Sequence, residues 1–144
     1  MTDKEYNAVI KIENRQRDES GEETVIPQEA ECSYHLKNGK LYIRYEETEH
    51  TVEQGVTTMI KADGKEVKIR RDGAYQMTMR YRTGMTDAFL YSMPYGQLPM
   101  RLVTQKAVWS GGEQGAKIYL EYTLEANGGR TENQMRITVR TKNA

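Results

Sequence analysis

Three side chains in this sequence have the chemistry of metal ligands or nucleophiles: Cys32, His35 and His50. A thiolate and an imidazole can share a zinc ion, and a histidine base can activate a thiol for attack on a substrate. Cys32 and His35 are three residues apart, however, and on a β-strand side chains at that spacing point to opposite faces. We therefore expect Cys32 and His35 to be ordinary strand residues and predict no metal site.

Two pairs of adjacent acids, Glu22-Glu23 and Glu46-Glu47, have the residue type needed for general acid–base catalysis. Neighbouring side chains on a strand diverge and acids beside turns are usually solvated, so we expect neither pair to be catalytic. The glycines between residues 111 and 115 match neither the dinucleotide-binding nor the P-loop pattern and are typical of a flexible hairpin. The sequence therefore predicts a protein that is not an enzyme and holds no cofactor.

Tyrosine gives the sharper signal, with ten residues in the chain. Tyr45, Tyr75 and Tyr122 are in phase with the apolar residues around them, whereas Tyr95 lies in a connecting segment. A buried phenol combines apolar bulk with a hydroxyl that needs a hydrogen-bond partner, so several of them could orient a small ligand. Alternatively, the tyrosines fill the interior and bond to backbone or water. The candidate ligand-binding residues are Tyr45, Tyr75, Tyr95, Tyr122 and His50.

The elements that must position these side chains are β-strands, because apolar and polar residues alternate along most of the chain. A period of two indicates strands with one buried face and one wet face. No segment has the 3.6-residue period and caps of a helix, so little or no helix is expected. Pro27 suggests a bulge or an edge in its strand. The predicted strands are residues 6–17, 23–37, 40–46, 55–62, 65–70, 75–82, 85–92, 98–109, 116–125 and 133–141.

Consecutive antiparallel strands would sort the connections between them onto two ends of the fold. One end is predicted to be mostly tight, and the other mostly long and polar. This contrast is typical of an up-and-down barrel that is closed at one end and binds a ligand at its open mouth. A two-sheet sandwich is the alternative. The tight end would hold residues 38–39, 63–64, 83–84 and 110–115, and the long end residues 18–22, 47–54, 72–73, 93–96 and 126–132.

Five arginines lie out of phase with the apolar residues of their strands. If they faced the interior, the leucines, isoleucines and methionines would form a large exposed apolar surface. We therefore expect the arginines on the outer face, where they can pair with acids, and part of that face could bind a protein partner. They are Arg44, Arg70, Arg80, Arg101 and Arg136.

Length and charge limit the other possibilities. At 144 residues the chain is expected to form one domain, residues 1–144, with an ordered core of about 6–141. It has 21 basic and 21 acidic residues, so neither nucleic acid nor an anionic membrane is an expected partner. We see no signal peptide and no apolar run long enough to span a membrane. Together with the single cysteine, these features favour a cytoplasmic protein.

Three segments resemble a known family: Gly-Lys-Leu-Tyr-Ile-Arg-Tyr-Glu at 39–46, Gly-Val-Thr-Thr-Met-Ile at 55–60 and Tyr-Ser-Met-Pro-Tyr-Gly at 91–96. They are similar to the YwiB-like family of bacterial proteins, which more often has threonine where this chain has Met93. The resemblance covers about residues 6–141. It implies an all-β, antiparallel, up-and-down calycin-like barrel of about eight to ten strands, related in shape to lipocalins. It implies no catalytic residues and no known function.

Together these observations favour a non-enzymatic barrel that binds a small, partly apolar molecule at its open end. The alternative is a protein-interaction or assembly module, including a homodimer, that uses the outer sheet face or an edge strand.

Overall fold

The structure, a computed structural model, describes residues 6–46 and 55–142, and these form ten β-strands and no helix. Accordingly, the described part of the chain has no helix able to cross a membrane. The strands are β1 (Ala8–Arg17), β2 (Glu23–Lys37), β3 (Lys40–Glu46), β4 (Thr57–Asp63), β5 (Glu66–Asp72), β6 (Met77–Arg82), β7 (Thr86–Met93), β8 (Gly96–Gly112), β9 (Gly115–Ala126) and β10 (Gly129–Thr141).

All ten strands belong to one antiparallel sheet with the order β6-β5-β4-β3-β2-β1-β10-β9-β8-β7. Each strand pairs with the next along the chain except at β6 and β7, while the first and last strands, β1 and β10, pair with each other. The two outermost strands, β6 and β7, are linked by one bridge in which Gln76 and Ser92 exchange backbone hydrogen bonds of 2.9 and 2.8 Å. The predicted up-and-down barrel is therefore confirmed, with a seam between β6 and β7.

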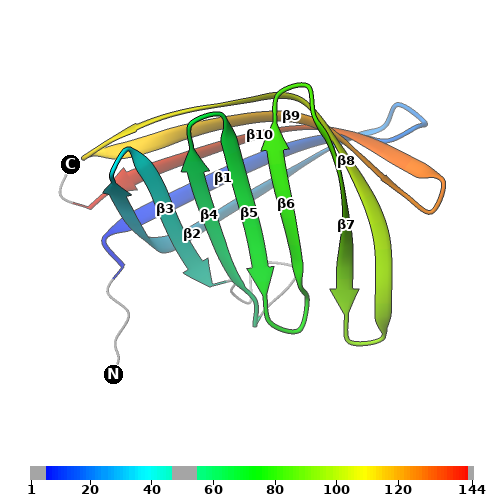
Figure 1. Cartoon of the computed structure of the whole chain (residues 1–144), viewed down its shortest axis with the longest axis horizontal. Helices are drawn as coiled ribbons and strands as arrows, with labels where there is room; N and C mark the ends of the chain where they lie inside the picture. Colours follow the sequence, from blue (N-terminus) through cyan, green and yellow to red (C-terminus); the bar gives the residue numbers. More distant parts are fainter. Residues whose placement is uncertain (1–5, 47–54, 143–144) are drawn as a thin grey trace.

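Strand β2 joins two halves of the barrel. Its first part, residues 23–32, pairs with β1, and its last part, residues 33–37, pairs with β3. The short strands β3 to β6 cross in front of the long strands β1, β9 and β10 (Figure 1). Pro27 lies in the part of β2 that has no partner on its β3 side, which fits the predicted edge position and needs no bulge.

Alternation along the strands places the apolar residues inside. Ile10, Ile43, Ile60 and Leu120 are at most 2% exposed. The intervening residues face solvent, and they include every one of the five arginines predicted to be outside: Arg44, Arg70, Arg80, Arg101 and Arg136.

One end of the barrel is packed shut. The Tyr34 hydroxyl lies 2.6 Å from the Gly112 carbonyl oxygen, to which it donates, and the Trp109 indole N–H donates to the Gly64 carbonyl at 3.0 Å. Gly111 packs closely against the side chains at this end, since a Cβ at position 111 would lie 2.8 Å from Cδ2 of Leu41. This is the end predicted to be tight.

The predicted contrast between tight and long connections is only partly right. Residues 126–132 were expected to form a long loop, but Asn127 and Gly128 make a tight turn with positive φ angles of 54° and 77°. That turn lets the polar residues 129–132 continue β10 and pair with β9. In the same way, strands β8 and β9 extend into the predicted loop 110–115. Strand β6 begins at Met77, two residues later than expected, because the pairing with β5 ends there.

Candidate functional site

A cavity of about 300 Å³ lies at the other end of the barrel, near the connections from β1 to β2 and from β5 to β6. This volume is at the lower end of the range for small-molecule sites. Half of the lining residues are isoleucine or methionine, and the others are one leucine, neutral polar side chains and one arginine. The lining residues are Ile12, Asn14, Gln16, Ile26, Gln28, Tyr45, Thr58, Ile60, Ile69, Arg71, Met77, Met79, Tyr122, Leu124, Met135 and Ile137.

Tyr122 on β9 forms the polar centre of one wall. Its ring packs edge to face against Tyr81, with centroids 4.9 Å apart and planes at 68°. Burial raises the pKa of Tyr122 to about 12, although hydrogen bonds with Tyr81 and Asn14 act in the opposite direction. Burial also raises the pKa of Tyr81 well above its usual value. Both phenols are therefore neutral near pH 7, and Tyr122, which lines the cavity, can orient a ligand there by hydrogen bonding.

A second set of polar side chains lies on the short strands β3, β4 and β5. Tyr45 pairs across β3 and β4 with Thr58, and Thr58 pairs across β4 and β5 with Arg71. Tyr45 is 5% exposed and Thr58 is 2% exposed. Each of these three side chains also takes part in a polar, aromatic or electrostatic interaction within the chain. The cavity therefore has polar groups on the short strands as well as on β9.

Buried hydrogen-bond acceptors surround Tyr122. Gln16, Asn133, Tyr122 and Thr104 are successive cross-strand neighbours on β1, β10, β9 and β8. Within the described residues, Oδ1 of Asn133 and Oγ1 of Thr104 have no hydrogen-bond partner, and neither does Oδ1 of Asn14. Of these three residues Asn14 lines the cavity, and because buried acceptors are usually satisfied, its Oδ1 can accept a hydrogen bond from a molecule other than the described chain.

Two of the five predicted binding residues, Tyr45 and Tyr122, line the cavity. Tyr75 is half-buried just before β6, where it packs on Tyr91 with ring centroids 6.0 Å apart. That contact lies beside the Gln76–Ser92 bridge and helps to hold the seam together. Tyr95 is 79% exposed in the turn between β7 and β8 and does not reach the cavity. His50 lies outside the described residues.

Several polar residues of the lining, above all Arg71, were not predicted from the sequence. Its signal was present: Arg71 follows the inward-facing Val67 and Ile69 at a spacing of two. The same parity argument finds Asn14 after Ile10 and Ile12 on β1. Both were overlooked because a polar residue at an inward position breaks the apolar pattern that defines the face.

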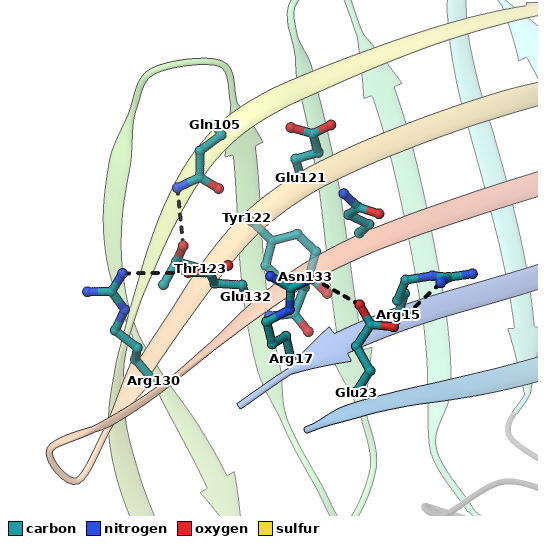
Figure 2. Close-up of a pocket in the computed structure, with 11 residues that line it drawn as sticks. Arg15, Arg17, Glu23, Gln105, Glu121, Tyr122, Thr123, Arg130, Glu132 and Asn133 are labelled. Atoms are coloured by element: carbon teal, nitrogen blue, oxygen red, sulfur yellow. Dashed lines mark hydrogen bonds and ion pairs between the residues drawn. The ribbon is translucent and has the colours of Figure 1, made fainter. Parts of the chain in front are cut away.

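A second hollow, of about 380 Å³ and lined mainly by polar and charged side chains, lies beside strands β1, β9 and β10 (Figure 2). Its charges pair with one another, as in the contacts of Glu23 with Arg17 at 3.1 Å and with Arg15 at 3.6 Å. Arg130 and Glu132 form a longer pair at 3.8 Å. Exposed pairs of this kind contribute about 0–1 kcal/mol each, so the hollow is a solvated surface with balanced charges.

Within the described residues, the groups first considered for catalysis or metal binding are not brought together, while Glu47 and His50 lie outside that part of the chain. Cys32 is completely buried and His35 is exposed, as expected from their opposite faces. Glu22 and Glu23 are both exposed beside the first turn. Among residues 6–46 and 55–142, no group of three or more His, Cys, Asp or Glu side chains could hold a metal ion.

Comparison with known proteins places the chain in a family. A relative named "Uncharacterized beta-barrel protein YwiB", from Bacillus subtilis (strain 168), is 28% identical over 122 residues, which is 85% of this chain and 84% of the relative. The crystal structure of the ywiB protein from Bacillus subtilis superimposes with a TM-score of 0.83 at 26% identity, covering 93% of this chain and 90% of that one. These matches confirm the resemblance found in the sequence. The family model described as "Domain of unknown function (DUF1934)" matches residues 10–138, and the chain therefore belongs to this family.

Proposed function

We propose that this barrel binds a small, partly apolar molecule in the cavity at its open end. The observation that carries the proposal is the mixed lining of that cavity, in which apolar walls surround Tyr45, Tyr122 and other polar groups. Binding sites for small molecules are typically apolar cavities with a few polar groups that fix the orientation of the ligand. The opposite end of the barrel is packed by Tyr34 and Trp109, which leaves the open end as the place to bind.

Energetics favour a ligand with polar as well as apolar parts. Burying about 200 Å² of apolar ligand surface contributes roughly 5 kcal/mol. Association opposes this with an estimated 4–15 kcal/mol of lost freedom. A purely apolar molecule would therefore bind weakly, and hydrogen bonds to groups such as Tyr122 and Asn14 would supply orientation and further affinity.

We propose further that the protein acts without catalysis. The two phenols in the interior, Tyr81 and Tyr122, have pKa values raised by burial above their usual range. General acid–base catalysis works best with groups whose pKa lies near the operating pH, so these phenols are poorly suited to proton transfer near pH 7. Tyr122, which lines the cavity, can hold a ligand by hydrogen bonding instead.

Two substitutions on adjacent residues of β2 test the proposal. Ile26 lines the cavity, whereas Val25 is 44% exposed on the opposite side of the same strand. A thermal-shift screen of small amphipathic compounds would first identify a ligand, which at 100 times its Kd adds about 2.7 kcal/mol of stability. Calorimetric titration then compares the wild type with Ile26→Trp and Val25→Trp. We expect Ile26→Trp to weaken binding at least tenfold and Val25→Trp to leave it unchanged. Equal binding by all three proteins would overturn the proposal.

The seam supports a second candidate function, association through an edge strand. Strands β6 and β7 end the strand order, and between them the structure has one isolated bridge outside the named strands. Leu90 on β7 is 50% exposed beside this edge. Such an edge can add a strand from a second copy of the chain. Light scattering after size-exclusion chromatography should then show a dimer that Leu90→Lys converts to monomer, whereas a wild-type monomer at high concentration would rule this dimer out.

A further inference from the structure

The outer face of the short strands carries an excess of positive charge. These strands lie in front of the long ones in Figure 1, so this face points toward the viewer. Two adjacent rows of outward side chains cross β2 to β6, and we call them the basic face. One row is His35, Tyr42, Lys61, Lys68 and Arg80, and the next is Ser33, Arg44, Met59, Arg70 and Thr78. Five of these ten residues are basic and none is acidic.

Most of this positive charge is not balanced by an ion pair. Arg70 pairs with Asp72, with its Nε 2.9 Å from a carboxylate oxygen. Lys61 lies near the ring of Tyr42, with its Nζ 5.9 Å from the ring centroid. The cations that form no ion pair with any described residue, and that are all at least partly exposed, are Arg44, Lys61, Lys68 and Arg80. These four cations are therefore available to an anionic partner.

The outer face of the long strands is different, because acids and bases alternate on it. On β1, Lys11 lies opposite Glu29 of β2 and Thr138 of β10, and Glu31 lies in the neighbouring row. The overall balance of 21 basic and 21 acidic residues, from which no nucleic-acid partner was expected, therefore hides a local excess on one face. Basic side chains gathered on one face are the electrostatic footprint that attracts a polyanion.

From this arrangement we infer that the basic face binds single-stranded nucleic acid, with phosphates on the lysines and arginines and a base stacked on Tyr42. Surfaces that bind single strands combine a positively charged track with aromatic rings on which unpaired bases stack. Tyr42 is 37% exposed and lies between His35 and Lys61 in its row. Neighbouring strands are about 4.8 Å apart, so each row is about 19 Å long, enough for a short stretch of single strand.

The composition of the face favours a nucleic acid over an acidic protein. The cores of protein–protein interfaces are depleted in charged residues, lysine among them. Here Lys61 and Lys68 occupy the middle of one row, and Tyr42 and Met59 are the only large apolar side chains in the two rows. Tyr42 can stack only on a base that is not held inside a duplex, which favours a single strand over a double helix.

Fluorescence anisotropy with labelled probes tests the inference. The probes are oligo(U) and oligo(dT) of about ten nucleotides, a DNA duplex of the same length and an oligoglutamate peptide of similar charge. We expect at least one of the single strands to bind, and to bind more tightly than the duplex and the peptide. Each neutralised phosphate contributes about −0.7 to the slope of log K against log salt, so contacts at three or four phosphates predict a slope of about −2 to −3.

Two triple variants with the same change in net charge identify the face. Lys61→Gln/Lys68→Gln/Arg80→Gln alters the basic face, and it should weaken binding at least tenfold and make the salt slope shallower by about 2. The control removes two lysines and one arginine that are exposed on the outer face of the long strands, and it should change neither quantity. This control is Lys11→Gln/Lys117→Gln/Arg140→Gln.

Tyr42 has a pair of variants of its own. Tyr42→Leu removes the ring and should weaken binding about tenfold, because stacking of a base on an aromatic side chain is lost. Tyr42→Phe keeps a ring for stacking and should bind as the wild type does. Equal binding by Tyr42→Leu and Tyr42→Phe would show that no base stacks at this position and would overturn the inference.

The remaining outcomes also decide the inference. Binding by neither single strand, binding of the duplex or the peptide as tight as that of the single strands, or an equal salt slope in the two triple variants overturns it. The basic face lies on the opposite side of the sheet from the cavity, so this inference is independent of the proposed ligand binding. The Ile26→Trp variant should accordingly bind these probes as the wild type does, and failure of either proposal leaves the other standing.

Discussion

Tyr81 and Tyr122 pack edge to face in the interior of the barrel, with ring centroids 4.9 Å apart. They come from β6 and β9, which are not neighbours in the strand order, so the contact crosses the interior. Tyr81 is completely buried, and Tyr122 also lines the cavity. Changes to this pair should therefore affect both the stability of the barrel and the proposed ligand-binding site.

Removing the hydroxyls of this pair should give strongly non-additive effects. Tyr81→Phe and Tyr122→Phe each remove the hydrogen bond between the two phenols, although Tyr122 keeps its bond with Asn14 and the Tyr81 hydroxyl keeps Sδ of Met79 at 3.3 Å. Each should lower the free energy of unfolding by about 1 kcal/mol. The double variant should lose less than the sum, because both single variants remove the same hydrogen bond between the two hydroxyls. Urea denaturation of the four proteins measures this coupling. Strict additivity would show that the two hydroxyls do not interact.

Stability should fall at alkaline pH because of the same two residues. The pKa of Tyr122 is raised from 10.0 to about 12 in the folded protein, so the folded state keeps a proton that the unfolded chain releases. This contribution is fully present below pH 10 and is lost as the pH rises towards 12, with each unit of pKa difference worth about 1.4 kcal/mol. Urea denaturation between pH 9 and 12 should show a shallower decline for the Tyr81→Phe/Tyr122→Phe double variant. Parallel curves for the two proteins would contradict the assignment.

Gly111 and Gly112 allow a test of packing at the closed end. A Cβ at position 111 would lie 2.8 Å from Cδ2 of Leu41, which is completely buried, whereas a Cβ at 112 would meet nothing within 4 Å. Gly111→Ala should therefore destabilise the barrel by about 1–3 kcal/mol, the usual effect of overpacking. Gly112→Ala should be close to neutral. Thermal unfolding compares the melting temperatures of the two variants. Equal melting temperatures would mean that the packing at the closed end tolerates an extra methyl group.

Cys32 should be chemically silent in the native protein. It is completely buried, and burial raises the pKa of its thiol to about 11. Since the thiolate is the reactive form, labelling by a disulfide reagent at pH 8 should be slow until urea unfolds the chain. His35 provides the control: a cysteine at this exposed position on the same strand, in the Cys32→Ala/His35→Cys variant, should label rapidly. Rapid labelling of native Cys32 would contradict the buried position.

Much of the architecture could be predicted from the sequence because each strand obeys one local rule. Period-two alternation fixed which side chains face inward, and turns such as Asn38-Gly39 fixed where strands end, since both residues adopt positive φ. Strands β2 and β3 have the predicted bounds. The bulge near Gln105 was not predicted because it depends on how β8 pairs with β9, and no local residue signals it.

The candidate site was harder to predict than the fold. Tyr45 and Tyr122 were found because their parity and their position near strand ends are local properties. Tyr75 has the correct parity, but the chain leaves the sheet at that point and turns its ring onto Tyr91. Arg71 was missed because charge normally marks the outer face, and recognising an inward arginine requires the register of β5 against β4 and β6.

The measurement that tests the central claim most directly is a crystal structure of the protein with the tightest ligand from the screen. We expect electron density for that ligand inside the open end, between Tyr122 and the wall that carries Tyr45 and Arg71. Density confined to the outer hollow at Arg15 and Arg130, or an open end filled by the protein's own side chains, would contradict it.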